Sequence, residues 1–195
     1  MKKSLFLLSI LPTWLMAFSI QGDVSYFRPS SHILREIYGK GWVDYKVELN
    51  GPVSSCHWFW EKISVFGDVS YLHKTGHSLG GHYKTEITIV PISLGLKWVQ
   101  PIGCATRFYL GAAPRYFFLR IHDHLSVVKE KINKNGLGGM AITGFNFDLW
   151  KGLYLDLFVS YSFKNFSKPS TPHGVRGHSL QVGGLDVGGG LGWTF

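Results

Sequence analysis

The sequence predicts an all-β protein, namely an eight-stranded antiparallel up-and-down transmembrane β-barrel. Stretches in which large apolar side chains alternate with small or polar ones recur along the chain, and this two-residue period is that of a strand with one apolar face. The polar faces are rich in glycine and other small residues, which suits a crowded interior. The connections between the stretches alternate in length, as they do at the two ends of a membrane barrel.

The N-terminal residues, 1–19, have the features of a secretory signal peptide. Two lysines precede an apolar run that ends at Leu15, and Ala17 and Ser19 form a small-x-small cleavage site. A membrane anchor helix is the alternative, but the run is shorter than the roughly 20 residues that span a bilayer. We therefore expect residues 20–195 to form one barrel domain. Its formal net charge would be +6 rather than +8, because the leader carries two lysines and no acid.

Eight strands follow in order from the alternation. The first is weak, at about residues 23–28, and a short helical stretch at Ile33–Tyr38 comes after it. In the fourth strand the apolar set changes phase between Ile89 and Val90, which predicts a β-bulge near Pro91. The remaining seven strands are expected at about residues 42–49, 63–71, 83–98, 107–118, 140–149, 153–164 and 185–195.

The apolar faces point to lipid in a membrane barrel and inward in a soluble sandwich or a lipocalin-like binder. Aromatic residues make up 15% of the chain, and tryptophans cluster near strand ends, as in the girdles of membrane barrels. These tryptophans are Trp42, Trp58, Trp60, Trp98, Trp150 and Trp193. The membrane barrel is therefore the preferred interpretation, with the lipocalin-like binder as an alternative.

The opposite faces then carry charges into a lumen that eight strands leave only wide enough for side chains. Buried charges must be paired, so we expect a plugging network, with a narrow ion path as the alternative. The residues expected inside are Asp44, Glu48, Asp68, Glu86, Asp148, Asp156, Asp186, Lys46, Lys62, Lys97, Arg107 and Arg115.

The links between strands predict which end faces outward. With the N-terminus in the periplasm, the long links 29–41, 122–136 and 165–178 lie outside, together with 74–81, whereas 50–57, 99–104 and 150–152 lie in the periplasm. The outer links are basic, in line with the pI of about 9.5. We expect Lys129, Lys131, Lys134, Lys168 and Arg176 to contact lipopolysaccharide or host-surface polyanions. No nucleic acid partner is expected of an exported barrel.

The C-terminal stretch GGLDVGGGLGWTF alternates up to Trp193 and Phe195. With the signal peptide and the segments VPISLGLKW and FYLGAAPRYFF, it resembles the small eight-stranded bacterial outer-membrane β-barrel proteins. The resemblance implies an integral outer-membrane location and a terminal signal, Trp193 and Phe195, that the barrel assembly machinery reads. The segment YFRPSSHILREIYGKGW is distinctive, and the sequence assigns it no role.

Catalytic patterns are weak. The stretch GHSLG around Ser78 matches a nucleophile elbow, which requires a parallel strand before it and a helix after it, and neither is expected here. Some barrels of this kind modify lipid A, and His124, Ser126 and Glu130 resemble their deacylase-like spacing. We expect no enzyme and keep this activity as the alternative.

No cofactor and no metal are expected, because His122 and His124 lack a third ligand. Cys56 and Cys104 fall in predicted periplasmic turns, where they could form a disulfide, remain free or cross-link to a partner.

Overall fold

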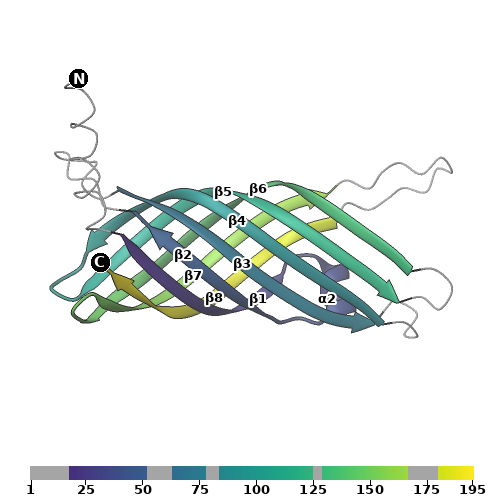
Figure 1. Cartoon of the computed structure of the whole chain (residues 1–195), viewed down its shortest axis with the longest axis horizontal. Helices are drawn as coiled ribbons and strands as arrows, with labels where there is room; N and C mark the ends of the chain where they lie inside the picture. Colours follow the sequence, from purple (N-terminus) through teal and green to yellow (C-terminus); the bar gives the residue numbers. More distant parts are fainter. Residues whose placement is uncertain (1–17, 52–62, 78–83, 125–128, 167–179) are drawn as a thin grey trace, which may run out of the picture.

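The fold is a closed barrel of eight antiparallel strands in chain order (Figure 1). The computed structural model describes residues 18–51, 63–77, 84–124, 129–166 and 180–195, without the side chains of 123, 124 and 129–132. The strands are β1 (Ser19–Pro29), β2 (Trp42–Asn50), β3 (Ile63–His77), β4 (Lys84–Pro101), β5 (Thr106–His124), β6 (Lys129–Trp150), β7 (Leu153–Phe166) and β8 (Leu180–Thr194). The predicted fold class is confirmed.

The barrel closes where the first strand meets the last. β1 pairs with β8 from Ser19 opposite Thr194 to Pro29 opposite Gly184. The backbone N–H of Phe195 donates to the carbonyl oxygen of Phe18 across 3.0 Å, so the ladder extends to the last residue. We call the end that holds the C-terminus the inner end. The opposite end, which holds the short helix α2 (His32–Tyr38), is the outer end (Figure 1).

Large apolar side chains cover the outside of the barrel, as predicted. On β2, the outward residues Val43, Tyr45, Val47 and Leu49 are 49–58% exposed, whereas the alternate residues Trp42, Asp44, Lys46 and Glu48 are at most 4% exposed. An apolar outer surface over a polar lumen is the arrangement of a barrel that crosses a membrane.

Aromatic residues lie on this outer surface towards both ends. Trp98, Trp150 and Trp193 are exposed at the inner end, as predicted. Tyrosine and phenylalanine take their place farther out, at Tyr26, Tyr71, Tyr116, Phe118, Tyr161 and Phe163. The prediction for Trp42 is wrong, because this residue is 1% exposed and lies inside the barrel. Trp58 and Trp60 lie outside the described residues.

β4 contains no bulge, so the prediction of one near Pro91 is wrong. The register with β3 and with β5 is the same on both sides of Pro91. Ile87 and Ile89 are 0% and 2% exposed and point into the barrel. The apolar residues change phase because the lumen itself is apolar near its outer end.

The strands extend farther outward than predicted. β5 continues to His124 and β6 begins at Lys129, so the link between them is 125–128 rather than 122–136. Lys129, Lys131 and Lys134 therefore belong to a strand and not to a loop, because this hairpin pairs without interruption from Thr106 opposite Phe147 to its tip.

Glycines on the inner face of β8 make room for neighbouring polar side chains. A Cβ atom at Gly190 would lie 2.1 Å from the carbonyl oxygen of Gly22 and 2.2 Å from Oδ1 of Asp23. One at Gly192 would lie 2.1 Å from Cζ of Tyr154. A side chain at Gly190 would therefore collide with the backbone of β1, and one at Gly192 would displace the Tyr154 ring, so glycine at both positions leaves room in the crowded lumen.

Deletion of Phe195 should reduce assembly of the barrel. The residue completes the seam between β8 and β1, and its side chain is 66% exposed, so its loss should affect closure and recognition during assembly more than internal packing. We expect severalfold less folded protein, measured as the heat-modifiable band on gels of unheated membranes. Normal yield and a normal rate of assembly would show that the terminal motif is not a signal.

Candidate functional site

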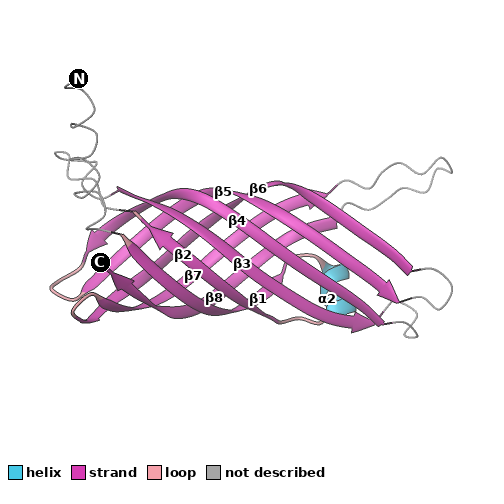
Figure 2. Ribbon diagram, viewed as in Figure 1, coloured by secondary structure: helices cyan, strands magenta, loops and turns pink. Residues whose placement is uncertain are grey.

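The helix α2 lies within the outer end of the barrel, at one side of it (Figure 2). It packs against β3 and β1, and its residues Leu34 and Tyr38 are buried. The hydroxyl groups of Tyr38 and Thr85 on β4 lie 3.0 Å apart. The helix ends at Gly39, whose φ of 87° favours glycine. The segment that the sequence left without a role is therefore a plug.

A close approach of backbone to backbone holds the plug. At Gly76 on β3, a Cβ atom would lie 2.1 Å from the carbonyl oxygen of Ile37 in α2. The indole N–H of Trp42 donates to the carbonyl oxygen of Gly39 across 3.2 Å. The residue after the helix and the first residue of β2 are thus tied together, which fixes the helix at the wall.

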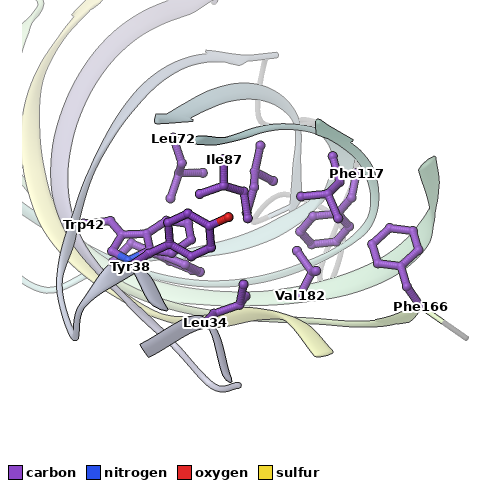
Figure 3. Close-up of a cluster of buried hydrophobic side chains, with 11 residues drawn as sticks. Leu34, Tyr38, Trp42, Leu72, Ile87, Phe117, Phe166 and Val182 are labelled. Atoms are coloured by element: carbon purple, nitrogen blue, oxygen red, sulfur yellow. The ribbon is translucent and has the colours of Figure 1, made fainter. Parts of the chain in front are cut away.

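Beneath the helix the lumen is apolar (Figure 3). Inward side chains of seven strands meet Leu34 and Tyr38 there, and the rings of Tyr38 and Trp42 pack edge to face at 5.8 Å. We call this set the outer cluster; it comprises Phe27, Leu34, Tyr38, Trp42, Leu72, Ile87, Ile89, Phe117, Leu119, Phe166 and Val182.

Two buried lysines organise the middle of the lumen. Lys97 forms an ion pair with Glu48, and its Nζ lies 4.5 Å from the ring centroid of Tyr109. Lys46 lies 3.1 Å from Oδ2 of Asp23 and 3.9 Å from Oε2 of Glu48. A carboxylate and an aromatic face therefore stabilise Lys97 together, which offsets the loss of hydration.

Asp156 is the acceptor of a second part of the network. Its carboxylate accepts hydrogen bonds from Gln21 at 2.7 Å, Asn146 at 2.8 Å and the Tyr109 hydroxyl at 3.0 Å. Farther out, Arg115 donates to Ser70 at 2.8 Å and pairs with Asp68 at 3.3 Å. These contacts join strands on different sides of the barrel, so the network fills the lumen across its width.

Most of the predicted lumen residues lie in this network or beside it. Asp44, Glu48, Asp68, Asp156, Asp186, Lys46, Lys97 and Arg115 are all buried. Arg107 and Asp148 pair at 2.5 Å at the inner mouth. The sequence did not predict Asp23 as a lumen residue, because the alternation in the first strand is too weak to show which residues face inward. Lys62 lies outside the described residues.

The prediction for Glu86 is wrong. It lies on the outer surface, where its carboxylate is 2.9 Å from Lys84, because the uninterrupted register of β4 sends its even-numbered residues outward.

Polar residues also form a row on the outer surface near the outer end. His73 on β3 pairs with Thr88 on β4, Thr88 with Arg120 on β5, and Arg120 with Asn133 on β6. Cross-strand partners share a face, and His73, Arg120 and Asn133 are exposed. His73 Nδ1 lies 3.1 Å from Thr88 Oγ1. We call these four residues the polar row; the sequence could show only that each is polar, not that they are adjacent.

The remaining predicted site residues cannot be placed as side chains. Ser78, Ser126, Lys168, Arg176 and Cys56 lie outside the described residues. His124 and Glu130 are described by backbone alone, with Lys129 opposite His124 and Asp123 opposite Glu130. The catalytic interpretation of His124, Ser126 and Glu130 stays a prediction.

Cys104 is exposed in the turn after β4. Because Cys56 lies outside the described residues, a disulfide between the two, free thiols and a cross-link to a partner all stay open as predictions. In the described part of the chain, no three His, Cys, Asp or Glu side chains come together to hold a metal ion. Within the same residues, no helix is long and apolar enough to cross a membrane.

Comparison with solved structures supports the fold. Neisserial surface protein A (NspA) is 14% identical with a TM-score of 0.58, over 91% of this chain and 97% of that one. OprG of Pseudomonas aeruginosa is also 14% identical at 0.58, over 93% and 97%. Ail of Yersinia pestis, in complex with the heparin analogue sucrose octasulfate, is 11% identical at 0.52, over 91% and 97%.

No family model and no curated protein matches the sequence. The chain thus has the fold of small eight-stranded outer-membrane β-barrels, as the resemblance implied. The apolar outer surface agrees with the expected location in the bacterial outer membrane.

Replacement of Lys97 by methionine should destabilise the barrel by about 3 kcal/mol, because it leaves buried Glu48 with only the more distant Lys46, 3.9 Å away, as a cationic partner. The double variant Lys97→Met/Glu48→Leu should recover most of that loss, since removing both charges also removes the uncompensated carboxylate. Urea unfolding in lipid vesicles measures both effects.

Lys84→Met is the matched control, because the pair of Lys84 with Glu86 lies on the exposed surface and should contribute less than about 1 kcal/mol. Equal effects at Lys97 and Lys84 would contradict a stabilising role for the lumen network.

Proposed function

We propose that this chain is an integral outer-membrane barrel that acts at its outer end, where basic side chains bind anionic surface ligands such as lipopolysaccharide. The observation that carries the proposal is the filled lumen. Among the described residues, α2 and the outer cluster occupy the outer end, and the ion network occupies the middle. A barrel filled in this way is better suited to a role at its surface than to transport.

Exposed cations at the outer end support the choice of ligand. Lys40 and Lys84 are exposed there. Lys129 and Lys131 belong to the outermost part of β6, and Lys168 and Arg176 belong to the last outer link. Several cations at one end of a membrane protein attract polyanions, although each exposed charge contributes little at physiological salt.

Lys134 has the least structural support among the residues expected to contact polyanions. It pairs with Leu119, whose side chain is buried in the outer cluster, and partners in a ladder share a face. We therefore assign polyanion contact to Lys129, Lys131, Lys168 and Arg176.

The structure of Ail contains a heparin analogue. That ligand belongs to Ail alone, but it is an anion of the class that we propose here.

We further propose that Trp193 and Phe195 are read by the barrel assembly machinery, since both are exposed at the inner end. Host-surface polyanions would be bound by the same charges as lipopolysaccharide.

The double substitution Lys129→Gln/Lys131→Gln should weaken the binding of purified, folded protein to immobilised heparin. Binding that depends on several exposed charges falls steeply with salt, so the variant should elute at a clearly lower salt concentration than the unmodified protein. Elution from a heparin column in a salt gradient measures this.

The control is Lys151→Gln, which removes an exposed lysine from the turn before β7 at the inner end. If it lowers the elution salt as much for each charge removed as the outer double variant does, retention reflects net charge, and the proposal of an outer binding surface fails. The same holds if binding persists unchanged at high salt.

A further inference from the structure

We infer that the polar row, His73, Thr88, Arg120 and Asn133, binds the phosphate group of a lipid A-type glycolipid in the outer leaflet. The inference rests on the proposed function, because it requires the outer end of the barrel to face the outer leaflet. It concerns the lipid-facing wall of the barrel rather than the outermost part of β6 and the outer links, so a different set of residues carries it.

The register of four strands builds the site. Because His73, Thr88, Arg120 and Asn133 are successive cross-strand partners, they lie in one line across β3, β4, β5 and β6. Side chains directly opposite one another on neighbouring strands are about 5 Å apart at Cβ. The line therefore presents an imidazole, a hydroxyl, a guanidinium and an amide to one ligand on the lipid-facing surface.

A depression of the outer surface lies beside three residues of the row, Thr88, Arg120 and Asn133. It is also lined by the outward residues Tyr71, Val90, Phe118 and Asn135. The residues of the next line towards the membrane centre are apolar or aromatic, with Val90 opposite Phe118. The Tyr71 ring stacks on the His73 ring at 6.5 Å, and Tyr116 packs against Phe118 at 5.0 Å. A polar edge above an aromatic surface suits a ligand with a charged head and acyl chains.

Arg120 is the residue on which recognition depends. It is exposed on a face that elsewhere meets lipid, and among the described residues it forms no ion pair. The neighbouring carboxylate on the same face, Glu86, is paired with Lys84 at 2.9 Å. The flanking outward residues on β5 are Phe118 and His122, neither of which is an anion. A guanidinium in this position is free to form two parallel hydrogen bonds to a phosphate.

The rest of the polar row adds donors and no negative charge. With the Thr88 hydroxyl donating to His73 Nδ1, the neutral imidazole carries its proton on Nε2, so the His73–Thr88 pair offers the ligand one donor. The side chain of Asn133 supplies an amide beside Arg120. Arginine, histidine and asparagine side chains can thus donate to phosphate oxygens, whereas a zwitterionic choline headgroup would bring its own cation close to Arg120. The chemistry therefore favours a phosphate monoester on a glycolipid.

The opposite wall provides a matched comparison. Arg28 on β1 is also an exposed arginine near the outer end. Its cross-strand partner on β8 is Leu185, and its pairing with β2 ends one residue earlier, at Phe27 opposite Trp42. Arg28 is therefore an exposed arginine of the same charge whose direct cross-strand neighbour is apolar, whereas Arg120 lies between Thr88 and Asn133.

The test is native mass spectrometry of the purified full-length barrel with lipid A that carries two phosphates, and with the same lipid after removal of both. We expect the phosphorylated lipid to bind and Arg120→Gln to weaken that binding about tenfold, as for the loss of a charge-assisted hydrogen bond. Arg120→Lys should retain part of the affinity, because it keeps the charge and loses the fork. Arg28→Gln should change the affinity less than about twofold, as for an exposed charge without donors beside it.

Three results would overturn the inference: equal weakening by Arg120→Gln and Arg28→Gln, equally tight binding of the dephosphorylated lipid, or full displacement of the lipid by inorganic phosphate. Heat-modifiability on gels verifies that each variant is folded. Heparin elution of the same variants separates the two proposals. Loss of lipid A binding with normal heparin elution would leave the proposed polyanion binding by Lys129 and Lys131 intact, and the reverse result would leave the wall site intact.

Discussion

The narrow interior of an eight-stranded barrel is the constraint on which this structure depends. Lipid outside requires an apolar outer surface, and the closed ladder removes every free edge. Polar side chains of the strands must then share a space that only side chains can fill. Each buried charge needs a partner there, so Lys46 and Lys97 lie between carboxylates and aromatic rings. The inner-facing glycines of β8 supply the room that these side chains need.

The same constraint explains why the outer end differs from the middle. Water would enter an open mouth, so inward apolar side chains at this level require a cover. α2 supplies one, with Leu34 and Tyr38 completing the outer cluster. The helix is short, and isolated helices of this length are marginal in water. Its stability therefore comes from burial in the barrel, and the apolar outer lumen and the plug depend on each other.

The two-residue period was sufficient to predict the strands and most of the lumen. It could not separate an apolar residue that faces lipid from one that faces an apolar lumen, because both alternate in the same way. Ile87, Ile89 and Trp42 were misassigned for this reason, and the bulge at Pro91 was inferred only to reconcile them. The local pattern also does not show which residues lie opposite each other on neighbouring strands. The partners of Asp156 and the alignment of the polar row require the register, which depends on how the whole sheet closes.

A charge on the outer wall is informative in a way that a charge on a loop is not. Lysines on loops stay in contact with water, so they cost little free energy and need no specific partner. An arginine on the lipid-facing surface costs about 2–4 kcal/mol at the membrane centre and close to nothing at the interface. Arg120 follows Phe118 on the same face of β5, directly beyond the aromatic residues, so its position corresponds to the headgroup level. Strands also hold their side chains more rigidly than loops do. A cation fixed at that depth, beside donors and away from free carboxylates, has an anionic headgroup as its natural counter-ion.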